Sequence, residues 1–174
     1  PKHHKGGQGG QDEGEYSSGA KFWLGPPGGA WAWNIEALNY VGGLIDFCIL
    51  GSADWHMAQG PLGILEPMKN ENWSGGYSRK LFDWQTRALN WIKKDVGVVP
   101  GGLMHDNHGP KKYRYYVNRK KVLIEHEYDP NTDIKYDNQG VLQLETWSER
   151  QIILRDKIRQ YFAARNEDMP ELRE

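Results

Sequence analysis

The stretch SRKLFDWQTRALNWIKKDVG, residues 78–97, carries the strongest helix signal in the chain. Its apolar side chains fall on one side of a helical wheel and its charged side chains on the other. The apolar members are Leu81, Phe82, Trp84, Ala88, Leu89, Trp91, Ile92 and Val96. Ser78 is a suitable N-cap, Gly97 a suitable C′ residue, and Lys93 and Lys94 suit the negative end of the helix dipole. The apolar face is wide, so we expect this helix to pack against more than one neighbour.

A second amphipathic helix is predicted to begin at Ser148, or two residues earlier at Thr146, whose spacing from Glu149 competes for the same capping role. Ser148 and Gln151 have the spacing of a capping box, and Trp147 and Ile152 have that of a hydrophobic staple. The predicted buried stripe of this helix is Leu154, Ile158, Tyr161 and Phe162. A third helix, over residues 35–50, is predicted to begin after the N-cap Asn34.

Between these helices the periodicity changes to two residues, which is typical of strands. We predict strands over residues 112–118, 122–128, 133–137 and 141–145, joined by turns into an antiparallel meander. The fold class is therefore α+β: a small antiparallel β-meander packed by two amphipathic helices, with a long irregular N-terminal extension. The predicted core is Leu81, Trp84, Ala88, Trp91, Ile92, Val122, Ile124, Leu154, Ile158 and Phe162.

The front of the chain has a different composition. Residues 1–22 are rich in Gly, Gln and charge, and we expect them to lack fixed structure on their own. The next segment, WLGPPGGAWAW at residues 23–33, is too apolar for a free loop, so we expect it to lie across a surface with its indoles in grooves. The tryptophans predicted to contact partners are Trp23, Trp31, Trp33, Trp55 and Trp73.

Length, charge and composition limit the classes of protein to which this chain can belong. The 174 residues predict an arm at 1–34, a domain at 35–165 and a charged tail at 166–174. A net charge of −1 argues against bulk electrostatic binding to nucleic acid or to an anionic membrane. The lone Cys48 allows no internal disulfide and no zinc-finger spacing, which is consistent with a reducing compartment. No run of apolar residues reaches the ~20 that a membrane-spanning helix needs.

One group of residues could bind a metal. Asp54 and His56 in one loop, and His105, Asp106 and His108 in another, supply ligands suited to zinc, iron or manganese. A further carboxylate such as Glu66 could then act as a base on bound water. This pattern allows a metal-dependent hydrolase, but the spacing matches no closed motif. Turn-capping polar residues explain the same pattern more simply.

A second group could bind nucleic acid. The segment KKYRYYVNRKK, residues 111–121, interleaves cations that neutralise phosphates with tyrosines that stack on bases. The candidate contacts are Lys111, Lys112, Arg114, Tyr116, Arg119, Lys120 and Lys121. The simpler interpretation is a solvated strand paired with the acidic segment that follows it.

The sequence contains no P-loop, no Rossmann glycine pattern and no nucleophile elbow, and it favours a non-catalytic role. The main hypothesis is an accessory subunit of a large multiprotein assembly, binding other protein subunits through the arm and an aromatic surface and needing no cofactor. We expect an intracellular protein, for which a mitochondrial complex, a virion or a ribosome are candidate hosts. A metal-dependent hydrolase with a divalent ion and an RNA-binding module are the alternatives.

Overall fold

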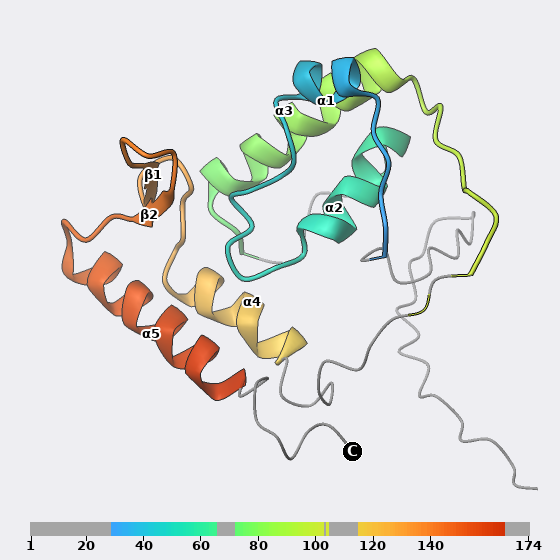
Figure 1. The fold of residues 1–174 in the computed structure, drawn as a ribbon. Coiled ribbons are helices and arrows are strands. Elements are labelled where there is room, and N and C mark those ends of the chain that lie inside the picture. The colour runs from blue at the N-terminus through green and yellow to red at the C-terminus, as the bar shows by residue number, and fades with distance from the viewer. Residues whose placement is uncertain (1–28, 66–71, 103, 105–114, 166–174) are drawn as a thin grey trace, which may run out of the picture.

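The computed structural model describes residues 29–65, 72–102, 104 and 115–165 (Figure 1). Within these residues the fold is α+β, as predicted. In chain order the helices are α1 (Ile35–Val41), α2 (Ala53–Gln59), the short 3₁₀-helix η1 (Gly60–Leu62), α3 (Gly75–Ile92), α4 (Tyr116–Glu125) and α5 (Glu149–Arg165). The strands β1 (Ile134–Tyr136) and β2 (Leu142–Leu144) form an antiparallel pair in which Ile134 is opposite Leu144. None of the described helices is long and apolar enough to cross a membrane.

Helix α3 is the centre of the core, as the sequence predicts, but its ends differ from the prediction. It begins after Ser74, whose hydroxyl accepts a hydrogen bond from the Tyr77 amide, and not after Ser78. It ends at Ile92 because Lys93 and Lys94 adopt left-handed backbone conformations, so Gly97 lies beyond the helix. Its buried side chains, Tyr77, Leu81, Trp84 and Ala88, follow the expected helical spacing.

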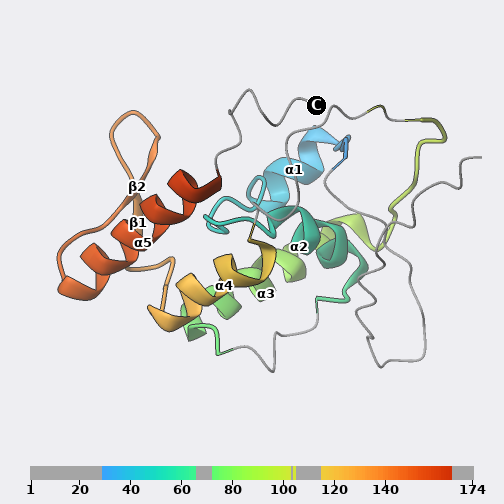
Figure 2. The ribbon, with the colours of Figure 1, turned by 90° about the horizontal axis from the view of Figure 1, so that it is seen from below.

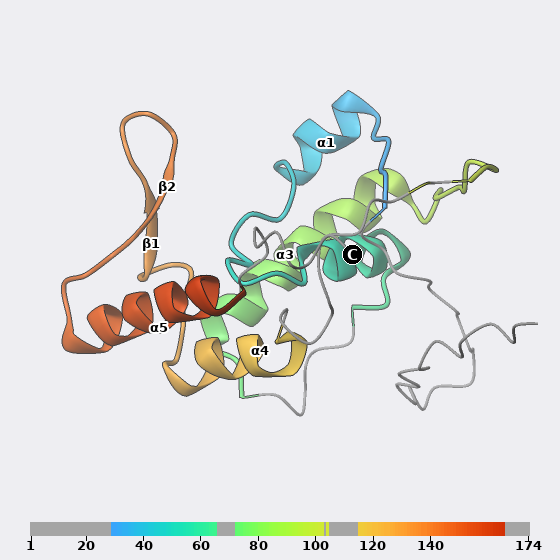
Figure 3. The same cartoon turned by 60° about the horizontal axis from the view of Figure 1, so that its bottom comes forward.

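Helix α1 packs across α3 and is held there by two polar side chains (Figures 1 and 3). The Trp84 indole N–H donates to the Gly43 carbonyl over 3.0 Å, and Arg87 Nε donates to the Val41 carbonyl over 2.8 Å. Asn34 caps α1 as predicted, accepting bonds from the amides of residues 36 and 37. The predicted helix over 35–50 is wrong beyond Val41, because Gly42 and Gly43 both adopt φ 87° and end the helix.

Residues 43–52 form an irregular segment, here called the strap, that runs from α1 to α2. Its side chains Ile45, Phe47, Cys48 and Leu50 are buried. The buried Tyr128 hydroxyl donates to the Phe47 carbonyl over 2.9 Å, and the Tyr77 hydroxyl lies 3.1 Å from Cys48 Sγ. The strap is therefore fixed to the core from two sides.

The first half of the predicted meander is wrong. Residues 116–125 form helix α4, where the sequence predicts a turn between two strands. Arg and Lys favour helices, and a short apolar run is compatible with both the helical period and the strand period. The burial of Leu123 therefore decides in favour of the helix. The strands predicted over 133–137 and 141–145 are present as β1 and β2. Helix α5 lies beside α4, and the hairpin lies near the start of α5 (Figures 1 and 2).

The capping box of α5 is confirmed. Gln151 Oε1 accepts from the Ser148 amide, and Ser148 Oγ accepts from the Gln151 amide. The predicted staple is wrong, because Trp147 is 82% exposed and lies below the Lys135 ammonium instead of on Ile152. Leu154, Ile158 and Tyr161 form the buried stripe. Two residues predicted as core, Phe162 and Trp91, are exposed.

Asp133 connects α5 to the rest of the fold. Its fully buried carboxylate accepts two hydrogen bonds from Arg150, at 2.6 and 2.9 Å, and one from Gln151 at 3.0 Å. The Asp129 amide donates a further bond at 2.9 Å. Burial acts to raise the pKa of Asp133, but these bonds together outweigh it and hold the pKa below its usual range.

Removing the Arg150 guanidinium leaves a buried carboxylate without its cation. We expect Arg150→Ala to lower the free energy of unfolding by about 3 kcal/mol in urea denaturation. Arg159→Ala is the matched control, because Arg159 is exposed and its pair with Asp156 spans 3.9 Å. That control is expected to cost less than about 0.5 kcal/mol. Equal losses in the two variants would contradict this account of Asp133.

The lowered pKa of Asp133 also predicts a pH dependence of stability. A carboxyl group with a depressed folded pKa stabilises the protein above its unfolded pKa of about 3.9, and the contribution is lost as pH falls through the folded value. We therefore expect the wild type to lose stability more steeply below about pH 4 than Asp133→Asn. Thermal unfolding followed by circular dichroism between neutral and acid pH measures the difference. Parallel pH profiles of the two proteins would argue against it.

Candidate functional site

The predicted metal ligands are only partly within the described residues. Asp54 and His56 lie on α2, where Asp54 Oδ1 accepts from the Trp55 amide over 2.9 Å and His56 is buried. His105, Asp106, His108 and the proposed base Glu66 lie outside the described residues. Among the residues that the structure places, no three His, Cys, Asp or Glu side chains gather in a group that could hold a metal ion.

The predicted basic and aromatic contacts do not form a hairpin. Lys111, Lys112 and Arg114 lie outside the described residues, and Tyr116 is the first residue of α4. The remaining members, Arg119, Lys120 and Lys121, occupy the middle of α4. The Arg119 guanidinium lies against the Gly51 backbone, where an added Cβ would come within 2.7 Å of it. Arg119 therefore packs on the strap in addition to carrying charge.

The predicted partner-binding tryptophans occupy several environments. Trp23 lies outside the described residues, and Trp55 is half-buried on α2. The Trp33 ring is 6.1 Å from that of Trp84, and Trp31 stacks on Trp33 with centroids 6.3 Å apart. Trp73 stacks on Tyr77 at 4.2 Å. The domain itself covers Trp33 and Trp73 in part, whereas Trp31 remains exposed.

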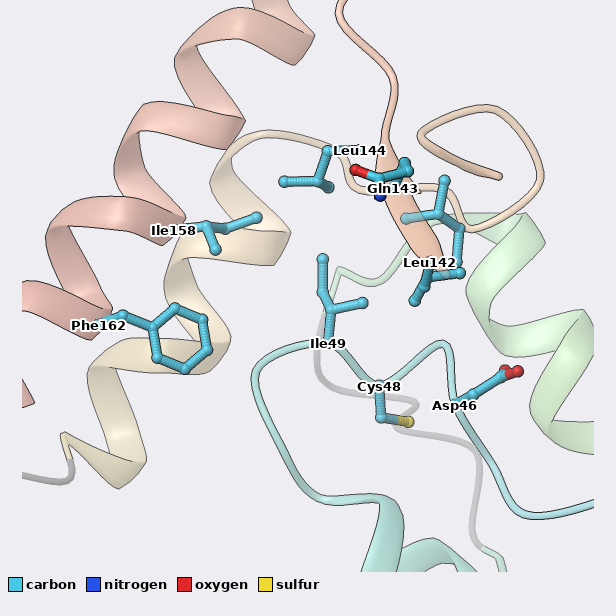
Figure 4. A pocket seen from close by; sticks show the side chains of 9 residues that line it. Asp46, Cys48, Ile49, Leu142, Gln143, Leu144, Ile158 and Phe162 are labelled. Atoms are coloured by element: carbon cyan, nitrogen blue, oxygen red, sulfur yellow. The ribbon is translucent and has the colours of Figure 1, made fainter. Parts of the chain in front are cut away.

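Three distant parts of the chain line an open pocket of about 410 Å³, here called the groove (Figure 4). The strap contributes Cys48 and Ile49, the hairpin contributes one residue of β1 and all three of β2, and α5 contributes one buried and one exposed side chain. The apolar side chains that the hairpin and α5 supply are Ile134, Leu142, Leu144, Ile158 and Phe162. This volume lies within the range of known ligand pockets, roughly 300–1,000 Å³.

The groove has one charged residue in its lining. Asp46 lies on the strap at the edge of the groove, and its carboxylate accepts a hydrogen bond from the Tyr136 hydroxyl. The other polar residue in the lining, Gln143, donates its amide to Asp137 over 3.0 Å. The chemistry of the groove is therefore that of an apolar surface with one carboxylate at its edge.

Cys48 is the one residue of the lining whose type can act as a nucleophile. It is buried, its sulfur lies 3.1 Å from the Tyr77 hydroxyl, and burial raises the pKa of the thiol to about 12. A thiol in this state is protonated at neutral pH and reacts slowly. Cys48 is therefore a small buried side chain in the wall of the groove.

The groove itself was not predicted from the sequence. Ile49 falls within a stretch predicted to be helical, and the alternation of Ile134, Tyr136, Leu142 and Leu144 indicates a shared face but not what lies opposite it. That alternation is the one local signal that could have pointed to the groove.

Comparisons with known proteins give no assignment. No protein-family model, no curated protein and no solved structure matches this chain.

The state of Cys48 gives a direct prediction. In the native protein at pH 8 we expect alkylation of this thiol to be on the order of a hundredfold or more slower than in the denatured chain, because burial suppresses both access and thiolate. Mass spectrometry after timed treatment with iodoacetamide, with and without guanidinium, gives both rates from one residue. Similar rates in the two conditions would show an accessible, reactive cysteine.

Proposed function

We propose that this chain is a non-catalytic accessory subunit of a multiprotein assembly. It contacts neighbouring protein subunits through its N-terminal arm, residues 1–34, and through an exposed apolar surface. The host is an intracellular assembly, and a mitochondrial complex is one candidate. The single buried cysteine is consistent with this location but does not choose among hosts.

The observation that carries the proposal is the exposure of the apolar side chains in the segment that follows α3. Val98 and Val99 are 91% and 87% exposed, and Met104 is 98% exposed. Val96 and Trp91 at the end of α3 are exposed as well. Scattered exposed apolar residues are ordinary, but a run of them in one segment is typical of a surface that a partner covers.

The energetics support the same interpretation. Burying a Val or Met side chain stabilises a structure by roughly 1.5–3 kcal/mol. The described domain gains almost none of this from Val98, Val99 and Met104, since their side chains remain in water. A neighbouring subunit that covered them would gain it on binding, less the cost of ordering the segment.

Two further exposed aromatic side chains extend the surface available to neighbours. Trp31 presents one face of a stacked indole pair, and Trp147 stands beside the hairpin. Aromatic side chains are enriched where protein interfaces bury most of their area. No comparable observation among the described residues favours the metal-dependent hydrolase or the RNA-binding module.

The test measures the stability of the domain and its assembly into a complex in separate experiments. We expect the double variant Val98→Ser/Val99→Ser to unfold within about 0.5 kcal/mol of the wild type, because these side chains make little contact within the domain. In native cell extract the wild type should migrate with a high-mass complex on size-exclusion chromatography, and the double variant should move toward the 20.0 kDa position. Val141→Ser, an exposed valine on the hairpin, is the control and should remain in the complex. A wild type that migrates alone at 20.0 kDa would refute the proposal.

A further inference from the structure

The outer edge of strand β2 has unpaired backbone groups. In an antiparallel pair, successive residues of a strand point their backbone groups alternately toward the partner strand and away from it. The bond from the Glu145 amide to the Asp133 carbonyl fixes this alternation in the register of the hairpin. The amide and carbonyl groups of Leu142 and Leu144 therefore point away from β1, and within the described residues no hydrogen bond uses them.

This edge borders the groove. The lining includes Leu142, Gln143 and Leu144, three successive residues of β2, whereas β1 contributes Ile134 alone. Side chains of successive strand residues point to opposite faces, so a pocket that touches all three residues also touches the backbone at the edge. Lysine and proline commonly protect an edge from pairing, and β2 has neither, whereas Lys135 lies in β1. The groove therefore combines apolar walls with unpaired backbone donors and acceptors (Figure 4).

These features specify the chemistry of an occupant. An extended peptide can add to an open strand edge, where main-chain hydrogen bonds supply affinity and alternate side chains supply specificity. Residues directly opposite each other in a sheet share a face. Alternate side chains of an added strand would therefore share the face of Leu142 and Leu144, which also line the groove with Ile49 and Ile158. Large aliphatic side chains suit these walls.

The charge at one end of the groove favours a cation. Asp46 accepts a hydrogen bond from the Tyr136 hydroxyl, and Tyr136 is directly opposite Leu142 in the hairpin. The Asp46 carboxylate therefore lies at the Leu142 end of β2 (Figure 4). Asp46 is exposed, so a lysine or arginine of the occupant can reach it from solvent.

We propose that the groove binds an extended segment of a neighbouring subunit, which adds a third strand at the outer edge of β2. The added strand is antiparallel, because antiparallel pairing is the more stable per residue. Every second residue of the segment is a large aliphatic residue that faces the groove, and a lysine or arginine follows beside Asp46. This inference rests on the proposed function for the origin of the segment, and it names the chemistry of that partner.

A peptide titration tests the groove on the purified full chain. The probe is acetyl-Ile-Thr-Ile-Thr-Lys-amide, added to protein that carries labelled Ile and Leu methyl groups. We expect saturable shifts in the NMR signals of Leu142, Leu144 and Ile158, and none for Ile153, an exposed residue of α5 outside the groove. Failure of this titration leaves the chromatography of the exposed-valine variant unaffected, so the two proposals fail separately.

Two N-methylated forms of the peptide separate strand pairing from apolar adhesion. In the added antiparallel strand the isoleucine amides face β2 and the threonine amides face away. Methylating the isoleucine nitrogens should weaken binding at least about tenfold, because it removes two main-chain donors. Methylating the threonine nitrogens leaves those donors in place and should change the affinity by less than about twofold.

Variants of the chain test the walls and the charge. Phe162→Ser removes a half-exposed ring from the lining and should weaken binding about five- to tenfold. Ile153→Ser is the matched control on the same helix and should change the affinity by less than about twofold. Asp46→Asn should weaken binding of the lysine-ended peptide about two- to fivefold and leave that of an alanine-ended peptide unchanged.

Three results would overturn the inference. Unshifted signals of the groove methyl groups would show that the peptide does not bind there. Equal weakening by the two methylated peptides would show apolar contact without strand pairing. Dimerisation of the peptide-free protein in sedimentation, reversed by the peptide, would assign the edge of β2 to a second copy of the chain.

Discussion

Asp133 is fully buried, so its charge has to be compensated inside the protein. Arg150 and Gln151, both in the first turn of α5, direct three hydrogen bonds to its carboxylate, and the Asp129 amide adds a fourth. The Asp133 backbone carbonyl accepts from the Glu145 amide over 2.8 Å, which closes the base of the hairpin. One residue therefore fixes the start of α5, the turn that precedes β1 and the end of β2 relative to one another. The hairpin has only three residues in each strand and depends on this arrangement for its position.

The turn that precedes β1 is also hydrogen-bonded to the helical half of the fold. Ser74 both caps α3 and donates its hydroxyl to the Tyr128 carbonyl over 2.7 Å. Gly76 lies so close to Asp129 that an added Cβ would collide with its carboxylate, which explains why a residue without a side chain stands in the first turn of α3. The Tyr128 hydroxyl continues the connection to the strap at Phe47. Burial raises the pKa of Tyr128, so this phenol stays protonated and remains a donor.

The features that the sequence predicted correctly depend on local chemistry. Asn34 and Ser148 cap their helices through bonds to amides two or three residues away, and the 3.6-residue period of α3 arises within one helix. The errors occur where contacts between residues far apart in the sequence determine the local structure. Helix α4 forms where alternation predicted strands because Leu123 is buried in the core, and Trp147 turns away from its predicted contact to lie below Lys135. The groove could not be predicted at all, since its walls come from residues as far apart in the chain as Cys48 and Ile158.

The two surfaces assigned to binding lie at opposite ends of the fold. The segment after α3 extends from one end, whereas the hairpin and the groove lie at the other (Figures 1 and 3). The groove depends on Asp133, since that residue holds both the hairpin and α5. The exposed valines depend on little beyond the end of α3, because Lys93 and Lys94 turn the chain away from the core there. A residue can therefore be changed on one surface without disturbing the other, and the exposed valines add almost nothing to the stability of the described domain. A chain that carries such side chains in water gains from them only when another molecule covers them.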